Sequence, residues 1–204
     1  MSRISTTIFF GAMFFIATLF FAAQSVSAAG LTEYKDTLSD SGPGEYANHT
    51  VAFTLGTDVS PSGYIDITPP AGFEIRSTST FDVRNVEMIV DGVTRTATST
   101  AGPGVDQVDI TTGSPGLIRY TLAPDTGLSS GDEVEILIGN HTSNARSFSV
   151  TFSTSTGTTT IQGDVEPVIN STVLGRHDVS VAVYDGGLVA SAKPIVFLIE
   201  KVLV

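Results

Sequence analysis

Apolar and polar residues alternate across residues 48–75, and this pattern constrains the fold more than any other feature of the chain. Successive side chains of a strand point to opposite faces, so a two-residue period is typical of strands that bury one face. The segment therefore predicts antiparallel strands whose apolar face packs on a second sheet. The alternating apolar residues are Val51, Phe53, Leu55, Ile65 and Ile67.

Turn-forming residues separate and end the predicted strands of the same segment. Ser60-Pro61-Ser62-Gly63 predicts a turn, because proline presets φ and glycine accepts positive φ. Pro69-Pro70 ends the second strand, since proline donates no backbone hydrogen bond. Gly72 lets the chain swing so that Phe73 and Ile75 return to the apolar layer.

The rest of the chain after residue 29 repeats this alternation. In no window of ten or more residues do apolar residues recur at intervals of three and four positions, which is the pattern of an amphipathic helix. We therefore expect no helix. Asp91-Gly92 and Asp185-Gly186-Gly187 predict tight hairpins. The final segment, 194–204, is interrupted by Glu200 and Lys201 and too short for a membrane anchor, so we expect a centrally buried closing strand. The other expected strands are 31–38 (at an edge), 86–90, 93–97, 105–111, 116–122, 134–138, 147–153 (with Phe148, Val150 and Phe152 inward), 158–162, 178–184 and one from 188 onward.

Residues 1–28 have the three parts of a secretory signal peptide. Arg3 precedes an uncharged apolar run, residues 8–23, and small residues around Ala28 form a cleavage site. The run has 16 residues, fewer than the roughly 20 that span a bilayer, which favours cleavage over an uncleaved anchor. The sequence therefore predicts a secreted protein, extracellular or in the cell envelope, with no stable membrane insertion after cleavage.

Charge and cysteine content limit the mature chain, residues 29–204. Arg3 is the only charge lost with the signal, so the net charge changes from −11 to −12. Phosphate backbones and anionic membranes both attract basic residues, so the acidic balance argues against nucleic acid and against an anionic membrane surface. The chain has no cysteine, so packing and hydrogen bonds must hold it together without disulfides.

These features predict an all-β fold, an Ig-like antiparallel β-sandwich, as one domain over residues 29–204. The runs VAFTL, GYIDITPPAGFEI, LSSGDEVEILIGNHTSN, VSVAVYDGG and IVFLIEKVLV resemble an Ig-like β-sandwich module of bacterial exported surface proteins of the candidate-phyla type. The resemblance implies a surface or extracellular module, and the family has no catalytic residues to carry over.

Two short motifs match catalytic patterns. Gly127-Leu128-Ser129-Ser130-Gly131 fits a hydrolase nucleophile elbow, which needs a following helix, but an alternating strand follows here. Asp125-Thr126-Gly127 fits an aspartic-protease triplet, but the chain has no second one. We interpret both as turns and expect no catalytic residues and no enzyme.

Metal ligands are sparse in the sequence. His49, His141 and His177 are isolated, whereas zinc sites usually have closer-spaced ligands. Asp106, Asp109, Asp132 and Glu133 are the acids that separate loops could bring to calcium, although none has EF-hand spacing. We expect no cofactor, with calcium left as an open alternative.

Other polar groups raise further alternatives. Lys35 would form an isopeptide crosslink only if it were buried beside a carboxylate. Asn48, Asn140 and Asn170 each begin a glycosylation sequon. Stacking on sugars is disfavoured, because the chain lacks tryptophan and its mature tyrosines, Tyr34, Tyr46, Tyr64, Tyr120 and Tyr184, are dispersed.

The sequence therefore favours an exported, non-enzymatic structural or adhesive module at or outside the cell surface, contacting an unidentified protein or glycan. The alternative is a β-sandwich that binds a glycan or protein ligand through its loops, with or without calcium.

Overall fold

A computed structural model describes residues 30–75, 83–143, 148–154, 157–163 and 168–200. Within these ranges the chain forms eighteen strands and one 3₁₀ turn, η1 (Val83–Asn85). No helix in the described part of the chain is long and apolar enough to cross a membrane. The predicted signal peptide, residues 1–28, lies outside the described residues.

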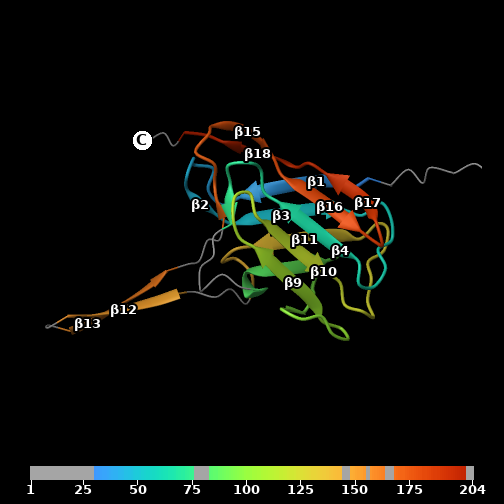
Figure 1. Ribbon diagram of the computed structural model, residues 1–204, viewed down its shortest axis with the longest axis horizontal. Helices are drawn as coiled ribbons and strands as arrows, with labels where there is room; N and C mark the ends of the chain where they lie inside the picture. Colours follow the sequence, from blue (N-terminus) through green and yellow to red (C-terminus); the bar gives the residue numbers. More distant parts are fainter. Residues whose placement is uncertain (1–29, 76–82, 144–147, 155–156, 164–167, 201–204) are drawn as a thin grey trace, which may run out of the picture.

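Two large sheets form the body of the protein (Figure 1). The first has five strands, all antiparallel, in the order β1 (Thr32–Leu38), β3 (His49–Thr54), β11 (Glu133–Ile138), β6 (Val86–Val90) and β7 (Val93–Thr94). The second has six, in the order β17 (Leu188–Ala192), β16 (Ser180–Tyr184), β4 (Tyr64–Thr68), β10 (Leu117–Thr121), β9 (Asp106–Thr111) and β8 (Ala97–Thr98). Only the pairing of β8 with β9 is parallel among the described strands.

The segment 48–75 crosses from one sheet to the other. β3 belongs to the five-stranded sheet and β4 to the six-stranded sheet, so the two alternating strands face each other across the core and do not pair. Gly63 sits at the crossing, where a Cβ atom would lie 2.5 Å from Val59 Cγ1 and 2.9 Å from the Tyr184 carbonyl oxygen. Only glycine fits there.

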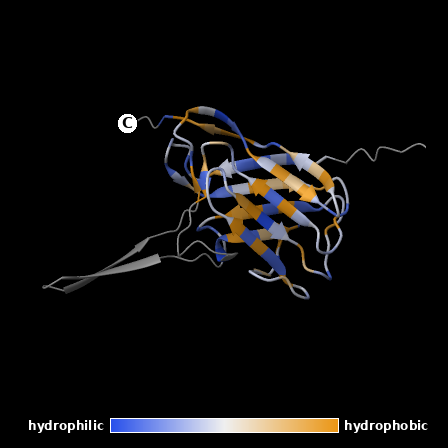
Figure 2. Cartoon of the chain, in the orientation of Figure 1, coloured by the Kyte–Doolittle hydropathy of each residue, from blue (hydrophilic) through white to orange (hydrophobic). Residues whose placement is uncertain are grey.

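The core fills the space between the two sheets, and β3, β4, β10, β11 and β16 follow the alternating pattern (Figure 2). Each buried aliphatic side chain contributes roughly 1.5–3 kcal/mol of transfer free energy. The antiparallel β-sandwich prediction is therefore confirmed. The largest fully buried side chains are those of Tyr120, Phe73, Leu55, Ile65, Ile67, Ile75, Met88, Ile118, Leu122, Ile136, Leu198 and Val51.

Three small sheets complete the described structure. They are β2 (Tyr46–Ala47), β14 (Val168–Ile169) and β5 (Glu74–Ile75); β15 (Gly175–Asp178) with β18 (Ile195–Leu198); and β12 (Phe148–Thr154) with β13 (Gly157–Gly163). The predicted inward orientation of Phe148, Val150 and Phe152 lies outside the described side chains.

Both predicted tight hairpins are present. Asp91 and Gly92 have φ of 50° and 78° and connect β6 to β7. Gly186 has φ of 68° in the turn between β16 and β17. The edge position predicted for residues 31–38 is also confirmed, because β1 is the first strand of its sheet.

The prediction of a centrally buried closing strand over 194–204 is wrong. β18 covers Ile195–Leu198 and pairs only with β15 among the described strands, outside both large sheets. Val196 and Leu198 are buried, but Ile195 and Phe197 are exposed. A continuous apolar run can belong to a strand buried on both faces or to one buried on a single face, and period alone does not separate the two.

Candidate interaction surfaces

The two catalytic-type motifs lie far from all three histidines. Ser129 precedes β11 and His141 follows it, so the six residues of β11, spanning roughly 20 Å, separate them. His49 pairs with Ile138, also at the far end of β11. His177 shares Phe73 with His49 as a ring partner, at 5.2 and 6.2 Å between centroids. The structure therefore brings neither Ser129 nor Asp125 to a histidine.

Asp125 and Ser129 act as turn residues. The Asp125 carboxylate accepts a hydrogen bond from the Gly104 backbone N–H at 2.8 Å, and this bond lowers the pKa of Asp125. The Ser129 N–H donates to Asp132 Oδ2 at 2.8 Å. These bonds satisfy backbone groups in exposed loops, which is the common role of aspartate in turns.

The two Asn-His-Thr segments, 48–50 and 140–142, meet at one end of the five-stranded sheet. The Asn48 side-chain amide donates to Asn140 Oδ1, and the Asn140 backbone N–H donates to Asn48 Oδ1 at 3.0 Å. His141 Nε2 lies 3.1 Å from Thr50 Oγ1. The repeated tripeptide was the sequence signal for this contact, although neither segment alone indicated its partner.

Gly139 makes this contact possible. A Cβ atom at residue 139 would lie 1.9 Å from Asn48 Oδ1, and the residue has φ of 135°. Gly139 also exchanges bonds with Asn85: its N–H donates to the Asn85 carbonyl at 2.7 Å, and Asn85 Nδ2 donates to the Gly139 carbonyl at 3.1 Å.

Two of the three sequon asparagines are buried by these and similar bonds. Asn48 is 9% exposed and Asn170 is 2% exposed. Asn170 Nδ2 donates to the carbonyl oxygens of Asp40 and Gly42 at 2.8 and 2.9 Å, which fixes the loop before β2. The folded chain therefore offers neither Asn48 nor Asn170 as an accessible glycan acceptor.

His49 itself is buried beside a charge. His49 Nδ1 donates to Asp36 Oδ2 at 2.8 Å, and both side chains are almost fully buried. Asp36 points inward from β1, next to Val51 of β3. The pair therefore joins the edge strand β1 to β3 on the buried side of the sheet.

The carboxylate of Asp106, a candidate calcium ligand, is buried and accepts hydrogen bonds from groups inside the protein. It is 1% exposed and accepts bonds from Arg95 Nε and Nη2 at 2.6 and 2.8 Å, the Tyr120 hydroxyl at 3.0 Å and the Ala123 N–H at 2.7 Å. Burial, together with the neighbouring Asp106 carboxylate, raises the pKa of Tyr120. Asp109 instead accepts bonds from Gln107 on the outer face of the sheet. In the ranges that the structure covers, no three histidine or acidic residues are grouped to hold a metal ion.

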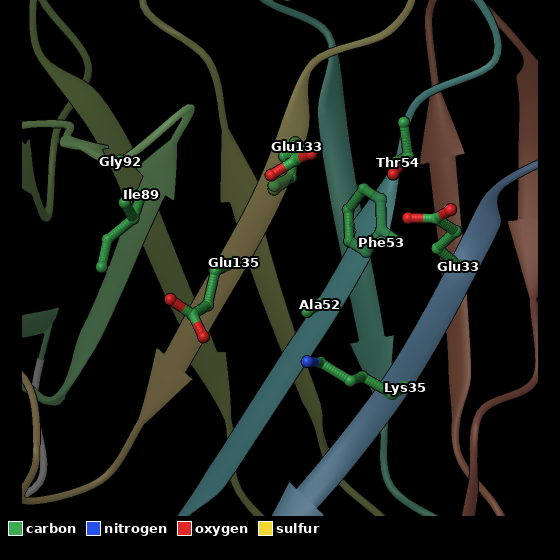
Figure 3. Close-up of a pocket in the computed structure, with 10 residues that line it drawn as sticks. Glu33, Lys35, Ala52, Phe53, Thr54, Ile89, Gly92, Glu133 and Glu135 are labelled. Carbon is green, nitrogen blue, oxygen red and sulfur yellow. The ribbon is translucent and has the colours of Figure 1, made fainter.

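The outer face of the five-stranded sheet carries a hollow of about 370 Å³ (Figure 3). Lys35 extends from β1 over β3, while Glu133 and Glu135 project from β11 and Glu33 lies at the bulge of β1. Among the described residues, none of these four side chains forms an ion pair. Lys35 is thus exposed in this hollow, so the burial that an isopeptide crosslink requires is absent.

Tyr64 and Tyr184 stack on the outer face of the other large sheet, although 120 positions separate them. Their ring centroids are 4.6 Å apart at 14°, because β4 and β16 place them directly opposite each other. Arg119, on the other neighbouring strand, lies 4.1 Å over the Tyr64 ring and bonds Asp66 through two nitrogens. These contacts cover both faces of Tyr64, so its ring is not a free platform for a sugar.

The remaining surface of note is on β18. Ile195, Phe197 and Ile199 are 41, 60 and 61% exposed, and Leu174, just before the paired strand β15, is 51% exposed. We call these four residues the β18 face. Exposed apolar side chains grouped in this way mark interaction sites more often than singly scattered ones.

Comparison with known proteins adds little to this description. No protein-family model matches the chain, and no curated protein matches it significantly. Among solved structures, the crystal structure of BslA, described as a bacterial hydrophobin, aligns with 12% sequence identity and a TM-score of 0.40. The alignment covers 82% of this chain and 96% of that one. Similarity at this level supports no inference about function.

Replacing Asp106 by Asn should lower the free energy of unfolding by roughly 3 kcal/mol, because Arg95 would keep its charge in a buried pair that has lost its carboxylate. Asp109→Asn, on an exposed position of the same strand, should change it by less than about 0.5 kcal/mol. Urea denaturation of both variants measures the difference. Equal stability of the two variants would show that the Asp106 network does not hold this end of the sandwich.

His141 should make the protein less stable as the pH falls. Burial lowers the pKa of His141 below its ordinary value of 6.5, so the unfolded chain binds the proton first and the free energy of unfolding decreases below about pH 6.5. His141→Gln should flatten this slope between pH 8 and 5, with a constant offset from the lost Thr50 contact.

The lower limit of pH 5 separates this effect from that of Glu87. Burial alone would raise the pKa of Glu87, but bonds from Ser143 and Thr94 outweigh it and lower the pKa below 4.5. The stability that Glu87 contributes is present above pH 4.5 and is lost in more acidic solution. Thermal denaturation at fixed pH values gives the slope, and an unchanged slope in His141→Gln would contradict the prediction.

Proposed function

We propose that this chain is an exported, non-enzymatic β-sandwich that serves as a structural or adhesive module at or outside the cell surface. The observation that carries the proposal is the β18 face, because it presents grouped apolar side chains on a domain whose core is already closed. The acidic mature chain and the expected signal peptide are consistent with a secreted, soluble protein that meets its partners outside the cell.

Three features support contact rather than catalysis as its role. Asp125 and Asp132 bind backbone groups in loops, and Asn48 and Asn170 bind backbone groups near strand ends. Asp106 and Arg95 neutralise each other inside the protein. The β18 face, in contrast, has no internal use, since only the opposite side of the strand contributes Val196 and Leu198 to the core.

The test is binding of the labelled mature protein, residues 29–204, to intact cells of the producing organism. Phe197→Ser should reduce the bound amount at least fivefold, because it removes the most central side chain of the β18 face. Val93→Ser is the matched control, since Val93 is 69% exposed and lies on β7, away from that face. Absence of binding by the unaltered protein, or equal loss in both variants, would contradict an adhesive role through this face.

The hollow on the five-stranded sheet supports a second candidate, a ligand-binding sandwich. Its mixed charges, Glu33, Glu133 and Glu135 with Lys35, suit a polar glycan or a basic segment of a protein. A glycan array probed with and without calcium separates the candidates. Binding that Glu135→Gln abolishes and Phe197→Ser leaves intact would favour the hollow over the β18 face.

A further inference from the structure

The outer face of the five-stranded sheet carries carboxylates that the fold leaves unpaired. Glu33, Glu133 and Glu135 line its hollow, and among the described residues none of their side chains accepts a hydrogen bond or forms an ion pair. On the outer face of the other large sheet, in contrast, Arg119 bonds Asp66 through two nitrogens. The negative charge of the hollow is therefore available to a ligand.

The hollow forms along β3 because the outward side chains of this strand are small. Ala52 and Thr54 form its floor, and longer side chains of β1 and β11 rise on both sides (Figure 3). Two residues of an extended strand span roughly 7 Å, so the floor has two positions about that far apart. At the Ala52 position the register places Lys35 on one side and Glu135 on the other, so the charges there sum to zero.

The Thr54 position is doubly negative. Glu133 lies directly opposite Thr54 on β11, and Glu33 lies on the other side, at the bulge of β1 (Figure 3). Adjacent strands are about 4.8 Å apart, so the strands that carry the two glutamates are roughly 10 Å apart. A guanidinium or ammonium group has several N–H donors and can bond a carboxylate on each side of it. The Thr54 position therefore fits a cationic side chain on a long stem.

We propose that the hollow binds an extended segment of another protein through one basic side chain, an arginine or a lysine. This side chain lies over Thr54, between Glu33 and Glu133. The segment runs along β3, and its next residue that points into the hollow is small and uncharged, because Lys35 and Glu135 already balance the Ala52 position. The inference rests on the second candidate function, since it names the ligand chemistry of the same hollow.

Other ligands fit the hollow less well. The net charge of −12 of the mature chain repels a nucleic acid and attracts basic partners from a distance. Among the residues that line the hollow, Phe53 is the aromatic one and is only 3% exposed, so no ring is offered to stack on a sugar. Within the described ranges, no three acidic or histidine residues are grouped to hold a metal ion. These observations favour a basic protein segment.

Nuclear magnetic resonance of the ¹⁵N-labelled mature protein, residues 29–204, tests the proposal. The probe is a short peptide, blocked at both ends, with one central arginine among threonines. It should shift the amide signals of residues 33–35, 52–54 and 133–135, and the same peptide with glutamine in place of arginine should not. Binding should weaken several-fold as salt is raised, because screening reduces the attraction between exposed charges. Equal shifts with both peptides would overturn the proposal.

Removing one carboxylate locates the bound cation. Glu133→Gln should weaken binding of the arginine peptide at least fivefold, because it removes one of the two carboxylates at the Thr54 position. Glu45→Gln is the matched control, since Glu45 is exposed and lies beyond the opposite end of β3. Both positions are exposed, so an unchanged thermal unfolding midpoint identifies variants that fold. Equal weakening in the two variants would overturn the placement of the cation.

Lys35 provides a test with the opposite sign. Lys35→Gln should strengthen binding of the arginine peptide about twofold, because it removes a positive charge roughly 7 Å from the bound cation. Lys193→Gln makes the same change in net charge at an exposed residue between β17 and β18, and it should leave the affinity unchanged. A Lys35→Gln variant that binds no more tightly than the Lys193→Gln variant would contradict the proposed arrangement.

The outcomes separate this inference from the proposed function. A protein that binds an oligosaccharide through Glu135 but not the arginine peptide would overturn the inference and keep the hollow as a ligand site. Shifts confined to the β18 face would also overturn it. A protein that ignores the peptide and still binds cells through Phe197 would remove this inference and leave the adhesive role in place.

Discussion

Burial of one face of each strand between two sheets is the constraint on which the rest of this structure depends. β3 and β11 contribute Val51, Val134 and Ile136 from one side, and β4 contributes Ile65 and Ile67 from the other. Because a shift of one residue in register would turn every apolar side chain toward solvent, this burial fixes the register of the central strands. The positions of all the surfaces described above follow from that register.

Polar contacts close the two ends of the sandwich. At one end, the Asp106 carboxylate gathers Arg95, Tyr120 and the backbone of Ala123. At the other end, Asn48 and the 139–140 turn bond each other. A satisfied buried polar network specifies one arrangement, because any alternative leaves a buried group without a partner. These contacts explain how a chain without cysteine defines its loops.

Much of the fold, and little of the surface, could be predicted from the sequence. Alternation located β3, β4 and β11, and Asp-Gly located the turn after β6, because both signals are local. The stack of Tyr64 on Tyr184 could not be predicted, since it depends on β16 pairing with β4 across 120 positions. Asp106 looked like a loop acid for the same reason, because its partners Arg95, between β7 and β8, and Tyr120, on β10, come from other parts of the chain.

The position of β18 also could not be predicted from the sequence. Its apolar run suggested a strand buried on both sides, but β18 lies outside both large sheets and buries only one face. The strand therefore covers one side of the core with Val196 and Leu198 and leaves Phe197 in solvent. An apolar side chain that the fold does not need is the strongest indication of contact in this molecule.

Hydrogen–deuterium exchange of the mature protein tests most directly whether the two-sheet core is the element that holds the structure together. Amides exchange at rates set by the free energy of the opening that exposes them, so the central strands should exchange only through global unfolding. The account predicts the slowest exchange in β3, β11, β4 and β10, with faster exchange in the β15–β18 ribbon. Rapid exchange in β3 and β11, or slower exchange in β18 than in either of them, would contradict it.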